Sequence, residues 1–273
     1  MRIGFIGAGK VGFSLGRYLA EHGVELAGYA SRSPESAREA AVFAGGQAFA
    51  SPEELVAASD LVFLTVPDGQ IAAVWEQLAS AARAGALDLE AKVICHCSGA
   101  LTSAEFAGAA ELGAFAYSVH PLLAINSKRD SYREIGRAPI TIEGDPACLD
   151  AIVRIFRSCG NDVHVIAPEH KVRYHAAAVM ASNLVVGLIH MAAGELELCG
   201  LSPEEAERAL RPISAGNALH IASDGITAAL TGPAARGDLE TIERHLACLE
   251  GDDREVYRII TDHLLGLVAA REA

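Results

Sequence analysis

Short apolar runs alternate with helical patterns along the first 167 residues, and no such run occurs after them. Eight runs have the length of strands, and apolar residues recur every three or four positions in the segments between them. The runs are residues 2–6, 24–29, 48–49, 61–66, 92–97, 115–119, 139–143 and 163–166. This alternation predicts an α/β fold with a doubly wound, parallel sheet between layers of helices.

The pattern changes near residue 167, where strand signals end and only helical periodicity remains. Helices are expected at residues 169–199, 203–223, 238–249 and 253–271. We therefore predict two domains, an α/β domain at residues 1–167 and an all-helical domain at residues 168–273.

The longest apolar run, residues 176–193, approaches the length that spans a membrane. Ser182, Asn183, Gly187 and His190 interrupt it. We expect a helix that is buried between domains or between subunits.

The composition narrows the classes of partner and compartment. The chain has 273 residues, 51% of them hydrophobic, and a formal net charge of −13. This charge argues against nucleic acid or an anionic membrane as the main partner. A strand that begins at residue 2 leaves no room for a signal peptide, and the six cysteines show no disulfide framework, so we expect a cytoplasmic protein.

Cys95 and Cys97 lie two positions apart on one predicted strand and therefore on the same face. They could form a metal-binding pair, but small core residues are the favoured interpretation. We predict no metal site.

The first strand leads into a glycine-rich turn. Gly7, Gly9 and Gly12 match G-x-G-x-x-G between a strand and a helix, which is typical of dinucleotide binding. Gly7 permits the tight turn, Gly9 lets a pyrophosphate approach, and Gly12 lets the helix pack closely. The N–H groups at the helix start then face the phosphates. The predicted cofactor-binding residues here are Gly7, Ala8, Gly9, Lys10, Val11 and Gly12.

The residues after the second strand indicate which dinucleotide is bound. NAD enzymes usually place an acid there, but this chain has Ser31, Arg32 and Ser33. Two hydroxyls and a guanidinium suit the 2′-phosphate of NADP. An alternative is a solvated loop in which Ser33 caps the next helix, and the two interpretations are compatible. We predict NADP (NADPH) as the cofactor.

Polar residues also follow the central strands. Val66, Pro67 and Asp68 end one strand, Ser98 and Gly99 another, and His120 a third. Ligands of such sheets bind beyond the carboxyl ends of the strands, so we expect these residues around the cofactor or substrate. Asp68 is also predicted to cap the following helix.

The first helix of the second half carries Lys171, His175, Ser182, Asn183 and His190. At 100° per residue, these five polar groups share about a third of an otherwise apolar helix surface. They either satisfy one another and a neighbouring helix, or they line a wet cleft that faces the cofactor. We favour the cleft.

Residues 230–238 contain glycine and proline and cannot form one continuous helix. They either connect two helices or aim Thr231 and Arg236 at an anionic group of a substrate. Asp238 is predicted to cap the helix that follows.

These motifs together resemble a family of Rossmann oxidoreductases with a C-terminal helical domain of uncharacterised function. The matching segments are Gly7–Gly12, His96–Gly99, His120–Leu122, Tyr174–Val179 with Ser182 and Asn183, and Thr231–Asp238. The family looks related to ketopantoate reductase, pyrroline-5-carboxylate reductase, 6-phosphogluconate dehydrogenase and the coenzyme F420-dependent NADP reductases. The resemblance implies NADP-linked reduction in a cleft between two domains, and homodimers built through the helices.

The resemblance also suggests roles for residues of the first long helix. Ketopantoate reductase and the hydroxyacid dehydrogenases carry Lys-x-x-x-Asn on this helix, where this chain has Lys171 and His175. The leading hypothesis is an NADP-dependent reductase of a small carbonyl or imine, such as the 2-oxo acid ketopantoate. Lys171 or His175 would supply the proton, Asn183 would orient the substrate, and the nicotinamide would lie near Ser98 and His120.

Two other functions fit the sequence. A non-catalytic NADP-binding redox sensor or regulatory protein would explain the missing Lys-x-x-x-Asn pattern. Hydride exchange between NADP and the deazaflavin coenzyme F420 is the third possibility.

Overall fold

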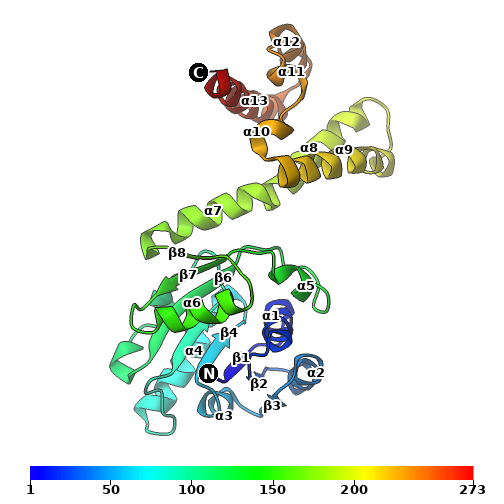
Figure 1. Cartoon of the computed structure of the whole chain (residues 1–273). Coiled ribbons are helices and arrows are strands. Elements are labelled where there is room, and N and C mark those ends of the chain that lie inside the picture. Colours follow the sequence, from blue (N-terminus) through cyan, green and yellow to red (C-terminus); the bar gives the residue numbers. More distant parts are fainter. Residues whose placement is uncertain (273) are drawn as a thin grey trace. The chain divides into compact units, whose positions relative to one another are not determined.

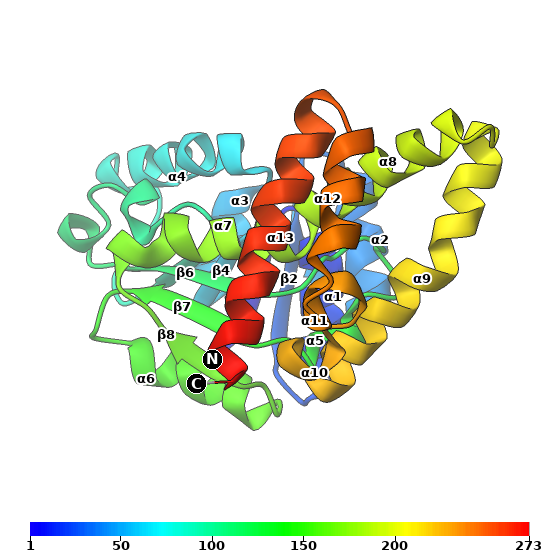
Figure 2. The same cartoon turned by 90° about the horizontal axis from the view of Figure 1, so that it is seen from above.

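The computed structural model describes residues 1–272 and divides into two compact units. The first unit is Met1–Met180, and the second begins at Ala181. The strands end before residue 168, as expected, but the first unit continues through most of helix α7 (Lys171–Ala181). Figure 1 labels the elements and Figure 2 shows them from above.

The sheet of the first unit contains all eight predicted strands. They are β1 (Ile3–Ile6), β2 (Leu26–Ala30), β3 (Gln47–Ala48), β4 (Leu61–Leu64), β5 (Val93–His96), β6 (Phe115–Pro121), β7 (Ile140–Gly144) and β8 (Val163–Val165). Their order in the sheet is β3-β2-β1-β4-β5-β6-β7-β8. The Rossmann-like, doubly wound arrangement is thereby confirmed.

The sequence predicts a parallel sheet, and this prediction is wrong for one pair of strands. The first six strands pair in parallel, but β7 pairs antiparallel with β6, and β8 runs parallel to β7. The cause is the connection at residues 122–139. It leaves the sheet at the carboxyl end of β6 and returns to the sheet at that same edge. The backbone N–H of Leu122 donates to the carbonyl of Pro139 at 2.9 Å, so β7 starts beside the end of β6.

Helices cover both faces of the sheet. They are α1 (Lys10–Glu21), α2 (Pro34–Ala44), α3 (Pro52–Ala57), α4 (Asp68–Arg83), the single turn α5 (Tyr132–Ile135) and α6 (Leu149–Ser158), with short 3₁₀ turns η1 (Ser103–Glu105), η2 (Ala110–Leu112) and η3 (Pro168–His170). One core packs β1 residue Phe5 with Phe13 of α1 and Phe156 of α6. The other packs Ile6 with Trp75 of α4. Alternate residues of the strands therefore face two separate cores.

The predicted helix at residues 169–199 is interrupted. Helix α7 ends at Ala181 and α8 runs from Asn183 to Leu198, with Ser182 in a non-helical conformation (φ −128°, ψ −78°) between them. The prediction of one continuous polar stripe is therefore wrong, because the break at Ser182 interrupts the regular rotation of 100° per residue. Lys171 and His175 belong to the first unit, whereas Asn183 and His190 belong to the second.

The segment Pro168–Leu198 is long and apolar enough to cross a membrane by length and composition alone. Its most apolar window has a mean hydropathy of 1.7, and none of that window is buried within the chain. Its expected burial between domains or subunits is thus not seen in a single chain and stays a prediction.

The second unit is all-helical, as predicted. After α8 it contains α9 (Pro203–Asp224), the short α10 (Ile226–Ala229) and α11 (Gly232–Ala235), α12 (Leu239–Cys248) and α13 (Gly251–Glu272). Asp238 caps α12 by accepting a hydrogen bond from the Thr241 N–H at 3.1 Å, which confirms that prediction. Residues 230–238 contain one helical turn, with Thr231 at its start and Arg236 at its end.

The close approach of α1 to the sheet yields a stability prediction. A Cβ at Gly12 would lie 2.4 Å from the carbonyl oxygen of Gly7 and 2.4 Å from Thr65 Oγ1. We expect Gly12→Ala to lower the unfolding free energy by about 1–3 kcal/mol, the usual cost of overpacking. Trp75, the only tryptophan and buried in this unit, reports urea unfolding by its fluorescence.

Gly9→Ala is the matched control. A Cβ at Gly9 would meet only the Thr65 carbonyl oxygen, at 3.9 Å, and the backbone φ of −80° suits alanine. Its unfolding curve should stay close to that of the unmodified chain. Equal destabilisation by both substitutions would contradict close packing at Gly12 as the constraint.

Candidate functional site

The glycine-rich turn between β1 and α1 has the geometry of a phosphate-binding loop. Gly7 has a φ of +109°, and its N–H donates to the carbonyl of Ala30 at 2.8 Å. Thr65 Oγ1 donates to the Gly7 carbonyl at 2.7 Å. No side chain caps α1, and the space beside Gly9 is open. The first N–H groups of α1 are thus available to an anionic ligand, which fits the pyrophosphate of a dinucleotide.

The loop after β2 lies next to this turn, because the Gly7–Ala30 hydrogen bond joins the two. Ser33 caps α2 by accepting from the Ser36 N–H at 3.2 Å, as the structural interpretation predicted. Arg32 is exposed, and no described residue forms an ion pair with it. The guanidinium of Arg32 is therefore available, whereas Arg38 is paired with Glu35 at 2.9 Å.

The end of β4 differs from its prediction in one respect. Val66 and Pro67 follow the strand as expected, but Pro67 is the N-cap residue of α4 and Asp68 is the first helical residue, with no side-chain cap. Asp68 instead accepts a hydrogen bond from Ser98 Oγ at 2.6 Å. The predicted cap is wrong because the carboxylate turns toward the end of β5.

Ser98 joins several elements at that point. Its hydroxyl donates to Asp68 and accepts from the N–H groups of Ala100 and Leu101 at 3.2 and 3.0 Å. Its carbonyl accepts from Ser118 Oγ at 3.1 Å and from Lys171 Nζ at 2.9 Å. Ser98 is only 5% exposed, so its hydroxyl is committed inside the protein. A contact between Ser98 and the cofactor stays a prediction.

Lys171 is fully buried under the start of α7. Its Nζ donates to the Ser98 carbonyl and, at 2.7 Å, to Ser118 Oγ. Burial lowers the pKa of this ammonium to about 8, although the nearby carboxylate of Glu143 raises it. The expectation that Lys171 faces an open cleft is wrong, because its charge joins α7 to the ends of β5 and β6.

Two histidines lie around Gly99. His120 comes from β6, and His175 lies on α7 one helical turn after Lys171. Nδ1 of His120 forms a hydrogen bond with the Tyr174 hydroxyl at 2.8 Å. The His120 and His175 rings lie edge to face, with centroids 6.3 Å apart. A Cβ at Gly99 would lie 2.5 Å from His175 Nδ1 and 3.0 Å from His120 Nε2. Only glycine at position 99 therefore leaves room for both rings at the strand end.

His175 carries an unusual atom. Its Nδ1 is buried and has no hydrogen-bond partner among the described residues. Buried polar atoms are nearly always paired, so this nitrogen marks a place where a bound ligand would complete the hydrogen bonding. The neighbouring Tyr174 belongs to the same cluster but was not among the predicted catalytic residues. Its spacing of three from Lys171 was the signal that could have found it.

The imidazoles of His120 and His96 are neutral near pH 7. Burial, together with the nearby Lys171 and His175, lowers the pKa of His120 to about 4. Burial also lowers the pKa of His96. Nδ1 of His96 accepts from the Ser98 N–H at 3.2 Å, so its Nε2 carries the hydrogen and donates to the Thr102 carbonyl at 2.9 Å. Burial raises the pKa of Tyr174, which keeps its hydroxyl protonated.

The remaining predicted residues lie in other surroundings. Cys95 is buried and Cys97 packs against the same core cluster, which confirms that they share a face. Asn183 begins α8, where its Oδ1 accepts from Ser182 Oγ at 3.1 Å. Thr231 lines a cavity of the helical unit, and Arg236 is exposed at the end of α11. Their participation in the same site as His175 stays a prediction.

Sequence comparison assigns the two parts of the chain to two family models. Residues 2–90 match the NADP oxidoreductases described as coenzyme F420-dependent. Residues 138–264 match a domain of unknown function, DUF2520. The first part of the chain is thus similar to the NADP oxidoreductases. The predicted enzyme class, cofactor and uncharacterised C-terminal domain are thereby confirmed at the level of these families.

Solved structures share the fold along the whole chain. A protein from Thermotoga maritima is 28% identical, with a TM-score of 0.77 over 99% of this chain and 100% of its own. A pyrroline-5-carboxylate reductase from Coxiella burnetii is 14% identical, with a TM-score of 0.63 over 98% and 97%. An imine reductase from Myxococcus stipitatus, solved with NADP+, is 15% identical, with a TM-score of 0.61 over 99% and 93%. No curated protein sequence matches the chain.

The lowered pKa of His120 predicts how stability depends on pH. The pKa is about 4 in the folded chain and 6.5 ordinarily, so between these pH values the unfolded chain binds a proton that the folded chain does not. The unfolding free energy should therefore fall as the pH is lowered from 6.5 to 4. The loss should reach up to about 3 kcal/mol, as a shift of this size implies.

Urea unfolding at pH 7 and pH 4.5, followed by Trp75 fluorescence, measures this effect. His120→Asn should remove that part of the pH dependence, whereas His164→Asn should keep it, because His164 is an exposed residue of β8. An unchanged slope in His120→Asn would show that His120 is not the group that resists protonation.

Proposed function

We propose that this protein is an NADPH-dependent reductase of a small imine or carbonyl compound and that the reaction takes place beside Gly99, His120 and His175. The unpaired Nδ1 of His175 supports this proposal most strongly, because a bound substrate or cofactor would give this buried atom a hydrogen-bond partner. Such an atom at the carboxyl ends of β5 and β6 lies where ligands bind in doubly wound sheets.

The dinucleotide would be held by backbone groups at one end of this edge. Gly7, Gly9 and the first N–H groups of α1 suit the pyrophosphate, and Arg32 suits the 2′-phosphate. Lys10 is exposed at the helix start, where a cation would add to the attraction. When bound, NADPH supplies the hydride, and its reactive ring would lie toward Gly99.

Proton delivery would fall to the neutral groups around Gly99. The Tyr174 hydroxyl is hydrogen-bonded to His120, and both are partly buried and uncharged near pH 7. A tyrosine and an imidazole in contact can pass a proton to the substrate without creating a buried charge. His175 would orient the substrate through Nδ1. Lys171 would act as a positioning residue, because its two hydrogen bonds hold Ser98 and Ser118.

The charge of the first unit favours an imine or a simple carbonyl over a 2-oxo acid such as ketopantoate. Lys171 is the cation beside the histidines, and its ammonium is already bound to Ser98 and Ser118. A substrate carboxylate would need another cation, for which Arg236 was the predicted candidate. The substrate panel below therefore contains both classes, as well as coenzyme F420.

We further infer a homodimer built through the helical unit, in the cytoplasm. Leu184, Val185 and Val186 of α8 are 57%, 46% and 71% exposed in the single chain. Contiguous apolar side chains of this kind usually mark a protein interface. Analytical ultracentrifugation tests this point, since a dimer of the 28.5 kDa chain has twice that mass.

Arg32→Ala tests the cofactor assignment. We expect NADPH to bind about 10- to 100-fold more weakly, on the scale of a lost charged hydrogen bond, while NADH binding stays nearly unchanged. Arg38→Ala is the matched control, because Arg38 lies nearby on α2 but is paired with Glu35. Equal losses for NADPH and NADH would place the adenosine end elsewhere. Titration of the cofactor's fluorescence gives both affinities.

A substrate panel followed by NADPH absorbance tests the reaction. We expect turnover with cyclic imines or simple ketones, and comparison arms contain ketopantoate, other 2-oxo acids and coenzyme F420. Turnover of none of these compounds by protein that binds NADPH would contradict a reductase. It would favour the non-catalytic NADP-binding sensor instead.

Substitutions of Tyr174 and His175 then separate catalysis from packing. Tyr174→Phe and His175→Ala should each lower kcat at least about tenfold, within the usual range for acid–base groups, with little change in NADPH affinity. His175→Asn should retain more activity than His175→Ala, and His164→Ala should behave as unmodified protein. A lower melting temperature with normal activity of the folded fraction would make His175 a core residue.

A further inference from the structure

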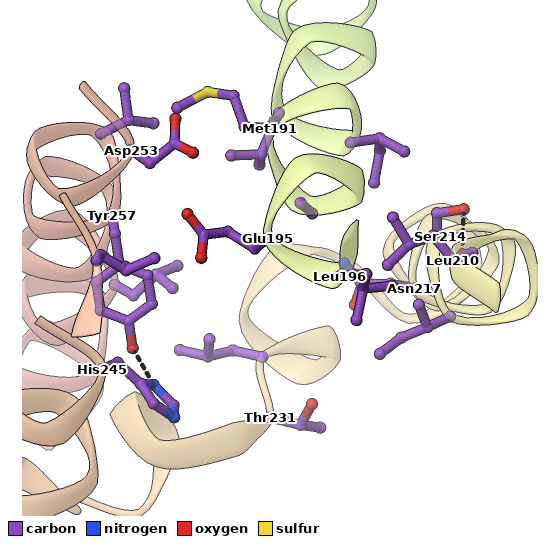
Figure 3. A pocket seen from close by; sticks show the side chains of 18 of the residues that line it. Met191, Glu195, Leu196, Leu210, Ser214, Asn217, Thr231, His245, Asp253 and Tyr257 are labelled. Carbon is purple, nitrogen blue, oxygen red and sulfur yellow. Dashed lines mark hydrogen bonds between the residues drawn. The ribbon is translucent and has the colours of Figure 1, made fainter. Parts of the chain in front are cut away.

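The helical unit contains a large cavity of its own. It has a volume of about 830 Å³ and lies among α8, α9, α10, α12 and α13 (Figure 3). Cavities of about 300–1,000 Å³ are typical of sites for small organic molecules. All its lining residues belong to residues 188–267, so the cavity is independent of the cluster around Gly99.

Most of the cavity wall is aliphatic. Representative lining residues are Leu188, Ile189, Leu210, Ile221, Leu264 and Leu267. The Tyr257 ring also faces the cavity, and its hydroxyl is hydrogen-bonded to Nδ1 of His245 at 2.7 Å (Figure 3). A ligand of this cavity must therefore have a mainly apolar body.

Two carboxylates interrupt the apolar wall. Glu195 of α8 and Asp253 of α13 point into the space between these helices, near Met191 (Figure 3). No lysine or arginine lines the cavity. Neither carboxylate has a hydrogen bond or an ion pair with a described residue. The cavity thus combines an apolar surface with two negative charges that lack a counter-charge within residues 1–272.

We propose that this cavity binds an organic amine in its ammonium form. Glu195 and Asp253 would neutralise the ammonium group, the aliphatic wall would hold the apolar body, and the Tyr257 ring would add a cation–π contact. The same charges would repel carboxylates and phosphates, so nucleotides and organic acids are excluded as ligands.

Helix α8 of a second copy fits the charges of the cavity less well than an amine does. The most apolar helix that a second copy could insert is α8, residues Asn183–Leu198, which contains neither lysine nor arginine. Inserting α8 would bury the two carboxylates without a counter-charge, which is costly. An amine provides the missing charge.

Calorimetry with three ligands of similar shape tests the proposal on the full-length chain without cofactor. At pH 7.5, 2-phenylethylamine carries a positive charge, 2-phenylethanol none and 3-phenylpropanoate a negative charge. We expect the amine to bind at least about tenfold more tightly than the alcohol and the acid not to bind, since the three ligands share an apolar body and differ chiefly in charge.

Substitutions locate the site. Glu195→Gln and Asp253→Asn should each weaken amine binding several-fold. Glu197 and Asp252 are exposed carboxylates close in sequence to Glu195 and Asp253. The control substitutions Glu197→Gln and Asp252→Asn should therefore leave amine binding unchanged. Equal binding of amine and alcohol, or the same weakening by the control substitutions, would overturn the proposal.

Absence of amine binding would also overturn the proposal. If the chain also sediments as a dimer, that result would favour a second copy as the occupant of the cavity. The proposal does not depend on the proposed reductase function. NADPH turnover is measured separately, so either can fail while the other holds.

Discussion

The buried ammonium of Lys171 is the interaction on which the candidate site depends. A charge removed from water must be paired or hydrogen-bonded, and Lys171 meets this need with the Ser98 carbonyl and the Ser118 hydroxyl. Ser98 follows β5 and Ser118 lies within β6, so the two hydrogen bonds fix the start of α7 at this edge of the sheet. Tyr174 and His175, three and four residues further along α7, are thereby aimed at the strand ends.

The two ends of the proposed cofactor site rely on different parts of the chain. The phosphate end is made mostly by backbone, with Gly7, Gly9 and the uncapped start of α1. The other end is made by side chains from β6 and α7 beside the end of β5, and burial together with the nearby Lys171 keeps His120 neutral by lowering its pKa. The neutral His120 imidazole and Tyr174 hydroxyl suit a reaction in which a neutral substrate accepts hydride and a proton.

Local signals in the sequence were sufficient for most elements. The eight strands, the glycine-rich turn and the caps Ser33 and Asp238 depend on neighbouring residues, and all were predicted correctly. Partners distant in sequence were not predictable in this way. Asp68 bonds to Ser98 thirty positions away, and β7 is antiparallel because its loop returns to the same end of the sheet. Periodicity placed Lys171 and His175 on one face but could not show that the ammonium is buried.

The crystal structure of the NADP complex is the most direct test of the central claim, that the groups around Gly99 form the reaction site. We expect the pyrophosphate at Gly9 and the start of α1, the 2′-phosphate at Arg32, and the nicotinamide beside Gly99. The cofactor or a co-bound substrate should supply the hydrogen-bond partner of His175 Nδ1. A nicotinamide bound away from Gly99, with His175 Nδ1 still unpaired, would contradict it.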